Sequence, residues 1–142
     1  MISHELAEAL KKAGLPWEPK LFDHLYHNQP GVDCYGEDGI VTGLHINSLA
    51  FFAFYPSEEK EVEHDLSWQD IAWLPSLSDL LHGIEARGYE CRSSKNKCEI
   101  WQGPLNDVTI YCTFIADAAV DADARCNAAA IALLWVLKEA VV

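Results

Sequence analysis

Basic residues are scarce in this chain of 142 residues, which holds 10 Lys and Arg against 22 Asp and Glu and has a formal charge of -12. Nucleic-acid binding relies on clustered Lys and Arg that neutralise phosphates, so the charge argues against direct nucleic-acid binding. The same charge disfavours adhesion to an anionic membrane surface. Half of the residues are hydrophobic, which excludes an acidic disordered tail.

Long hydrophobic runs are also missing. The longest apolar stretches, 49–55 and 128–137, are much shorter than the roughly 20 residues of a membrane-spanning helix. No basic segment followed by an apolar one occurs at the start, so we expect no secretory signal and a cytoplasmic protein. Five cysteines, an odd number in a chain of this size, do not suggest a secreted disulfide framework, and we expect reduced thiols.

The length fits one domain that buries its own hydrophobic core. We therefore expect a single domain over 1–142. Its N-terminal half, 1–72, is predicted to hold two helices and a hairpin. The second half, 73–142, is predicted to hold a helix, three strands and a closing helix.

The first two predicted elements are helices. Ser3 is a typical N-cap for a helix over 4–13, and Gly14 is a typical residue to end it. Pro19 suits the first turn of a second helix that ends near residue 28. The apolar side chains of this second helix would be Leu21, Phe22, Leu25 and Tyr26.

The rest of the N-terminal half is read from its composition. Residues 40–46 and 49–55 are rich in Ile, Val, Phe and Tyr, which predicts two strands joined by a tight turn at Asn47 and Ser48. Residues 49–54 also fit a short buried helix. The segment 57–65 has five acidic residues in nine positions and is typical of a solvated connector. Calcium binding by this segment is the more specific alternative, but the ligand spacing and central glycine of an EF-hand are missing.

The second half begins with a strong helix signal. Ser76 and Asp79 fit a capping box, in which each side chain accepts a hydrogen bond from a free backbone N–H, and Gly88 fits a left-handed cap. One face of this helix would be formed by Leu77, Leu80, Leu81 and Ile84. A final helix over 121–139 is apolar nearly all round, so it must be covered by other elements or by a partner subunit.

Three strands are predicted between these helices, at 89–92, 97–101 and 107–114. Strands joined by short turns pair antiparallel, and helices then layer onto the sheet. The predicted fold class is therefore α+β, with an antiparallel sheet and helices packed on it in a sandwich-like arrangement.

Two cysteines flank the polar turn 93–96. If all four of its residues form the turn, Cys91 faces Cys98 across the hairpin, and Cys112 lies on the same sheet face. Three small thiols in the core are the favoured interpretation, because free Cys is among the most buried residue types. A redox pair and a metal site are the alternatives, although the spacing is neither Cys-x-x-Cys nor that of a zinc knuckle.

Histidines supply the best candidate metal ligands. His24 and His27 would share a face of the second helix, and Cys34 and His45 follow, which together are ligand types that zinc takes. No recognised metal or catalytic signature is present, and the acidic pairs lie in a run where water would surround them. We therefore expect no cofactor, no assigned metal and no catalytic residue.

Aromatic residues are the candidates for partner contact. Trp and Tyr are enriched in binding hot spots because each combines a large apolar body with one polar group. Trp68 and Trp73 precede the capped helix, whereas Trp101 and Tyr111 would lie on the sheet face opposite the cysteines. An uncovered face with Trp101 and Tyr111 would suit association.

The second half also resembles a known group of proteins. A Trp-x-Pro-Ser segment at Trp73 to Ser76 leads into a helix that ends at Arg87, Gly88 and Tyr89, and an Ala-rich helix closes the chain. These features, over about 73–139, resemble the phage alpha-beta-alpha sandwich domain of small phage and prophage proteins. The resemblance implies the same α+β sandwich and a phage-derived origin; it implies no activity and no site residue.

Three functions are compatible with these features. The first is an accessory or interaction protein of phage origin that acts by protein–protein contact, including self-association as a homodimer. The second is an acidic inhibitor, of the immunity or nucleic-acid-mimicking type, that blocks a basic enzyme. The third is a zinc- or thiol-dependent enzyme that uses His24, His27, Cys34 and the pair of Cys91 and Cys98.

Overall fold

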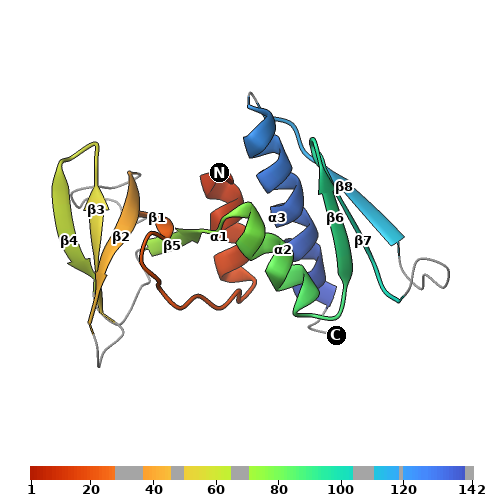
Figure 1. The fold of residues 1–142 in the computed structure, drawn as a ribbon, viewed down its shortest axis with the longest axis horizontal. Coiled ribbons are helices and arrows are strands. Elements are labelled where there is room, and N and C mark those ends of the chain that lie inside the picture. Colours follow the sequence, from red (N-terminus) through yellow and green to blue (C-terminus); the bar gives the residue numbers. More distant parts are fainter. Residues whose placement is uncertain (28–36, 46–49, 65–70, 104–110, 119, 140–142) are drawn as a thin grey trace. The chain divides into compact units, whose positions relative to one another are not determined.

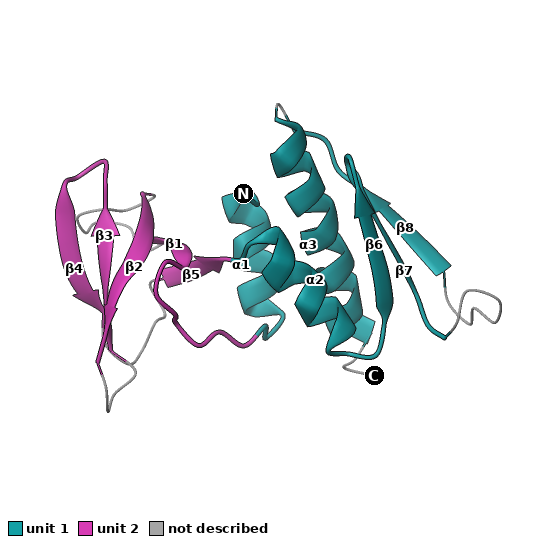
Figure 2. Cartoon of the chain, in the orientation of Figure 1, with its two compact units in different colours: residues 1–15, 75–142 teal, residues 16–74 magenta. Residues whose placement is uncertain are grey.

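The computed structural model describes residues 1–27, 37–45, 50–64, 71–103, 111–118 and 120–139 (Figure 1). The chain forms two compact units: unit 1 comprises residues 1–15 and 75–142, and unit 2 comprises residues 16–74 (Figure 2). In chain order the described elements are α1 (His4–Lys12), β1 (His24–His27), β2 (Asp38–Leu44), β3 (Phe51–Tyr55), β4 (Lys60–His64), β5 (Ile71–Leu74), α2 (Leu77–Glu85), β6 (Glu90–Ser94), β7 (Lys97–Trp101), β8 (Tyr111–Ile115) and α3 (Asp121–Glu139).

Helices and antiparallel sheets together make the fold α+β, as predicted. Unit 1 holds a three-stranded sheet in the order β6-β7-β8, and unit 2 holds a five-stranded sheet in the order β4-β3-β2-β1-β5. In unit 1, α3 packs on β7 and β8, and α2 packs on α3 and β6. Unit 1 is therefore a helical layer on one face of an antiparallel sheet (Figure 1).

Local hydrogen bonds explain where the helices of unit 1 begin. The Ser3 hydroxyl accepts from the Leu6 N–H at 3.2 Å and caps α1. At α2 the Ser76 hydroxyl accepts from the Asp79 N–H at 3.1 Å, while the Asp79 carboxylate accepts from the Ser76 N–H at 3.0 Å. This confirms the predicted capping box, which satisfies two N–H groups that no helical carbonyl reaches.

The long helix α3 spans the predicted residues 121–139. Five of its alanines are buried, and α1, α2 and the sheet pack around it. Small side chains on several faces allow these neighbours to approach closely. Gly83 of α2 shows this, because a Cβ added there would lie 3.2 Å from Leu133. Elements of unit 1 therefore supply the cover that this apolar helix needs.

Unit 2 has its core on one face of its sheet, which we call the inner face. The buried residues there are Leu25, Val41, Phe51, Ala53, Tyr55 and Ile71, with Trp17 and Val62 packed against them. The ring of Tyr55 lies against the backbone of β2, and a Cβ at Gly39 would sit 2.8 Å from it. Gly39 therefore leaves the space that Tyr55 fills.

The predicted second helix is wrong. Residues 24–27 form β1, which pairs antiparallel with both β2 and β5. The Asp23 carboxylate accepts from the Lys20 N–H and the Trp17 indole, each at 3.0 Å, and Phe22 has a φ of 71°. This local turn would end a helix before β1. The pairing of β1 with a strand on each side outweighs the apolar spacing of its sequence, which indicated a helix.

The acidic connector predicted at 57–65 is also wrong over most of its length, because Lys60–His64 forms β4 and pairs with β3. Val62 and His64 point to the inner face and Glu61 and Glu63 to the other, which is the alternation of a strand. The two strands predicted at 40–46 and 49–55 are found as β2 and β3 and pair antiparallel. Their predicted turn at Asn47 and Ser48 lies outside the described residues.

Candidate functional site

The predicted metal ligands do not come together in the described structure. His24 and His27 lie three residues apart on a strand, so they point to opposite sheet faces, and only His27 is buried. His45 follows β2, and its Nε2 lies 3.1 Å from Glu63 Oε1. Cys34 lies outside the described residues. Within those residues, no group of three or more His, Cys, Asp or Glu side chains is placed to hold a metal ion.

Sequence reasoning missed a buried polar cluster on the inner face of unit 2. The Tyr55 hydroxyl lies 2.7 Å from His64 Nε2, and the rings of His27 and His64 have centroids 5.6 Å apart. Both histidines are 6% exposed. β2 and β3 lie between β1 and β4 in the sheet, and the two histidines, 37 positions apart in the sequence, meet over the inner face. Hydrogen bonding offsets the cost of burying these polar rings in the core.

The cysteine hairpin has a different register from the predicted one. Lys95 and Asn96 alone form the turn, so Ser93 faces Cys98 and Cys91 faces Ile100. The two thiols are diagonal neighbours, and Cys112, which faces Ile100, shares their sheet face. All three lie on the side that packs against the helices, and Cys98 is fully buried.

Burial keeps the hairpin thiols protonated. Desolvation, reinforced by the Cys98 and Glu85 charges, raises the pKa of Cys91 to about 12. Desolvation and the Glu99 charge raise the pKa of Cys98 to about 11. Because the thiolate is the nucleophile and the metal ligand, these values give no support to a thiol-dependent activity at neutral pH.

These pKa values predict a loss of stability in alkali. Below pH 8.5, roughly the pKa of an exposed thiol, folded and unfolded thiols are both protonated and add no pH dependence. Above it, the unfolded thiols lose protons that the folded thiols keep until about pH 11 and 12, so the free energy of unfolding falls as pH rises. Denaturant titrations from pH 7 to 11 should therefore show a shallower decline in the Cys91→Ala/Cys98→Ala variant than in the wild type. Equal slopes would contradict this account.

Of the two tryptophans that precede the capped helix, Trp73 packs against the core of unit 2. The indole of Trp73 stacks on that of Trp17, with centroids 6.0 Å apart and planes 11° apart. Trp17 also meets Phe51 edge-on at 5.6 Å. This places Trp73 on the inner face of unit 2, where its contacts are internal. Trp68 lies outside the described residues.

Trp101 and Tyr111 lie on the sheet face opposite the cysteines, as predicted. They are directly paired across β7 and β8, and their rings stack with centroids 6.2 Å apart. Trp101 is 8% exposed, whereas Tyr111 is 52% exposed. Of these two residues, Tyr111 is therefore the one whose ring offers a large contact area to a partner.

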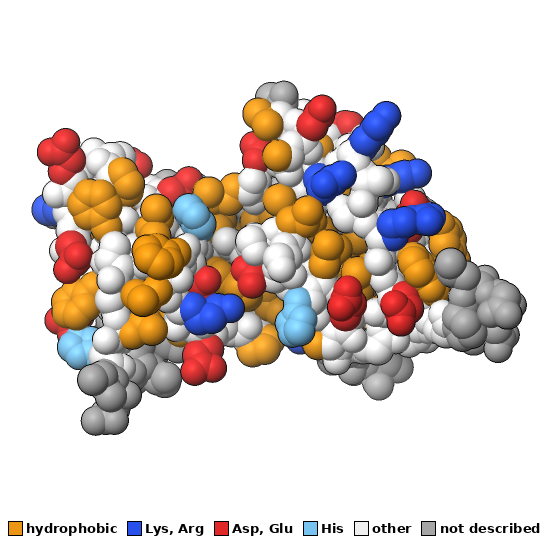
Figure 3. All heavy atoms as spheres, viewed as in Figure 1, with side chains coloured by type: hydrophobic (Ala, Val, Ile, Leu, Met, Phe, Trp, Pro, Cys, Tyr) orange, Lys and Arg blue, Asp and Glu red, His pale blue; other side chains and the backbone are white. Residues whose placement is uncertain are grey.

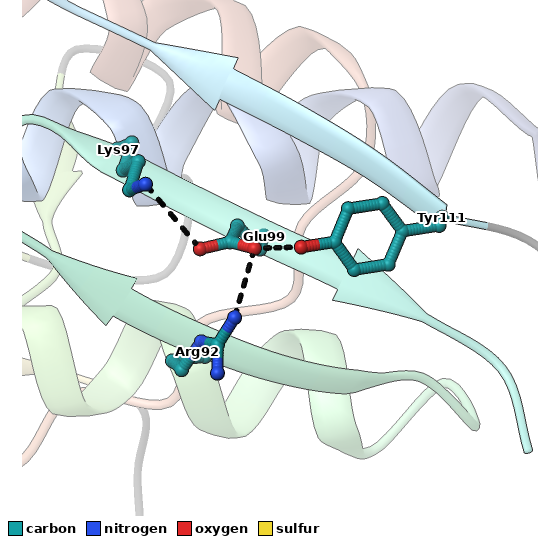
Figure 4. A network of polar contacts seen from close by, with 4 residues as sticks. All are labelled: Arg92, Lys97, Glu99 and Tyr111. Atoms are coloured by element: carbon teal, nitrogen blue, oxygen red, sulfur yellow. Dashed lines mark hydrogen bonds and ion pairs between the residues drawn. The ribbon is translucent and has the colours of Figure 1, made fainter. Parts of the chain in front are cut away.

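A buried carboxylate organises this face of unit 1 (Figure 4). Glu99, 6% exposed, lies 3.0 Å from Arg92 Nη2 and 3.7 Å from Lys97 Nζ, and it accepts a hydrogen bond from the Tyr111 hydroxyl. Arg92 and Tyr111 approach it from the two neighbouring strands. The network ties the three strands together and fixes the direction of the Tyr111 ring.

A second exposed surface lies on unit 2, opposite its core. We call it the acidic outer face, and it is formed by Ile40, Thr42, His45, Phe52, Phe54, Glu61 and Glu63. Phe52 packs over Gly43, where a Cβ would lie 3.3 Å from its ring, and His45 stacks on Phe52 at 5.1 Å. The Thr42 hydroxyl donates to Glu61 at 3.2 Å. Exposed Phe54 therefore lies among ordered polar groups.

Charge is distributed unevenly between the two units. Unit 2 contains eleven of the 22 acidic residues of the chain but only two of its ten basic residues, Lys20 and Lys60. Acidic and hydrophobic side chains adjoin each other on the visible part of unit 2, whereas most of the visible Lys and Arg side chains lie on unit 1 (Figure 3). The excess negative charge is therefore chiefly a property of unit 2.

Comparisons with known proteins found no match to a family model, a curated protein or a solved structure. Among the described residues, no helix is both long enough and apolar enough to cross a membrane.

Proposed function

We propose that this protein is an accessory protein that acts by protein–protein contact, and that the acidic outer face binds a basic surface of its partner. The observation that carries the proposal is the combination on one sheet face of exposed Phe54 with Glu61 and Glu63. An aromatic anchor beside carboxylates suits a partner whose Lys or Arg side chains surround an apolar patch. The resemblance of residues 73–139 to small phage proteins supports a phage or prophage origin.

Charge would act mainly on the rate of association. A unit with eleven acidic and two basic residues attracts a basic surface over distances of about one Debye length, roughly 8–10 Å at physiological salt. Phe54 would then contribute after contact, when water leaves the interface. If the bound basic surface is the substrate-binding surface of an enzyme, the same contact would block it, and an acidic inhibitor is therefore the second candidate function.

Charge reversal on this face tests the proposal. The tagged wild-type protein and its Glu61→Lys/Glu63→Lys variant would be used for affinity capture from a lysate of the source organism, followed by mass spectrometry. Both residues are exposed, so the variant should fold normally. We expect the wild type to capture a basic protein. The variant should capture at least about tenfold less of the same protein.

The matched control reverses two exposed acidic residues of unit 1. The Asp117→Lys/Glu139→Lys variant changes the net charge by the same amount and should retain the partner. Equal loss in both variants would mean that only net charge matters, and equal retention would mean that another surface binds. Either outcome, or the absence of any captured basic protein, would refute the proposal.

A further inference from the structure

The two sheets differ in how their edge strands are protected. Edge strands expose unpaired backbone groups, and proteins usually protect them with charged side chains or cover them. β4 and β6 carry charges, including Glu61, Glu63, Glu90 and Arg92. β5 has no charge but is buried over most of its length. All but one of the four edge strands in the described sheets therefore have a recognisable form of protection.

β8 is the exception among the described edge strands. Its sequence Tyr-Cys-Thr-Phe-Ile contains no charged residue, no proline and no glycine. Tyr111, Thr113 and Ile115 are all exposed, and Ile115 is 64% exposed. On one side β8 pairs with β7, and no described strand pairs with its other side. An exposed apolar edge of this kind favours the addition of another strand.

The sequence of β8 is complementary to itself. In an antiparallel pair of two copies centred on Thr113, Tyr111 of each copy lies opposite Ile115 of the other. Thr113 lies opposite its own counterpart, and Cys112 lies opposite Phe114. Aromatic with β-branched pairs and Thr with Thr pairs are among the stabilising cross-strand combinations, each contributing roughly 0.2–1 kcal/mol. This register also pairs all five residues of the strand.

The strand is held in place before any partner arrives. Tyr111 donates to the buried Glu99 carboxylate and stacks on Trp101. On the other face, Phe114 contacts Trp135 of α3 with ring centroids 5.9 Å apart. Side chains that are already ordered lose less conformational entropy on association. β8 is therefore a rigid edge, which favours pairing in one register.

We propose that the protein forms a homodimer in which β8 pairs antiparallel with β8 of a second copy about a two-fold axis at Thr113. The two three-stranded sheets then join into one sheet of six strands. Such an interface is closed, since the same surface is used by both copies. The charged β6 strands form the two new edges and resist further growth. This inference uses only unit 1 and is independent of the proposed partner of unit 2.

Disulfide trapping tests the register. In the Thr113→Cys variant, the two introduced thiols would face each other across the axis at a distance that a disulfide spans. The matched control is Ile115→Cys, because Ile115 is also exposed but would face Tyr111 of the second copy. With oxidised glutathione, we expect Thr113→Cys to form covalent dimer at least about tenfold faster than Ile115→Cys or the wild type, because its thiols are held at high effective concentration. Equal rates in the three proteins would overturn the proposal.

A second variant tests the dimer without a disulfide. Thr113→Lys places two like charges opposite each other at the axis, while its exposed position leaves the fold intact. Sedimentation over a range of concentrations should show a monomer–dimer equilibrium for the wild type and a dissociation constant raised at least about tenfold in the variant. A wild type that stays monomeric or forms open-ended polymers would overturn the proposal, and so would a Thr113→Lys variant that dimerises as tightly as the wild type.

Discussion

The Phe51→Ala variant is expected to lose about 3–5 kcal/mol of unfolding free energy, which is the usual cost of removing a fully buried aromatic ring. Phe51 is completely buried on the inner face of unit 2, where its ring contacts Trp17 at 5.6 Å and His64 at 5.4 Å. Removing the ring leaves a cavity between these side chains. Because domains are typically stable by about 5–15 kcal/mol, the loss would be a large share of the total.

Phe54→Ala is the matched control for this substitution, because Phe54 lies on the same strand but on the acidic outer face and is 37% exposed. We expect a loss of at most about 1 kcal/mol for this variant. Denaturant unfolding followed by Trp fluorescence measures both changes, since Trp17 and Trp73 lie on the inner face. Similar losses in the two variants would contradict the assignment of inner and outer faces.

Leu133→Ala is expected to cost about 2–5 kcal/mol in unit 1. Leu133 is 1% exposed and lies where α3 approaches Gly83 of α2. Two helices that are already close have little freedom to move together and refill the space. Most of the cavity would therefore remain, and its cost adds to that of the lost burial.

The adjacent Leu134 gives the control for this prediction. It is only half-buried, although it has the same side chain and lies in the same helix. Leu134→Ala should cost roughly half as much or less, because its side chain gives up less buried surface. Thermal unfolding followed by circular dichroism measures both variants. A larger loss for Leu134→Ala would contradict the described packing of α3.

Much of unit 1 was predictable because its signals are local. The capping box of Ser76 and Asp79 fixes the start of α2 within four residues of sequence. The apolar length of α3 and the alternation in the third strand are similarly direct. The hairpin register was missed because the turn uses only Lys95 and Asn96, with Lys95 at a φ of 45°, rather than the usual Asn-Gly pair.

Unit 2 was harder to predict because distant residues decide its structure. The spacing of Leu25 and Tyr26 suits a helix, yet pairing with β2 and β5 makes their segment a strand. The acidic run looked like a solvated connector until pairing with β3 showed that its alternate residues face the core. In both segments, sheet pairing far along the chain outweighed the local pattern.

The candidate surfaces were predictable only in part. The position of Trp101 and Tyr111 opposite the cysteines followed from strand alternation. The Glu99 network and the cluster of His27, Tyr55 and His64 each join residues from different strands. Contacts between strands depend on how the sheet pairs, so the sequence alone did not reveal them. The sequence does place Glu61 and Glu63 two apart, which is the spacing of one strand face, and a strand assignment there would have pointed to the acidic outer face.

The central claim is that the acidic outer face binds a basic partner, and the association rate constant with the captured partner tests it most directly. Measured at low and physiological salt, the wild-type rate constant should fall as salt rises. The rate constant of Glu61→Lys/Glu63→Lys should be at least about tenfold lower at low salt and depend less on salt. Equal rate constants for the two proteins at both salt concentrations would contradict the claim.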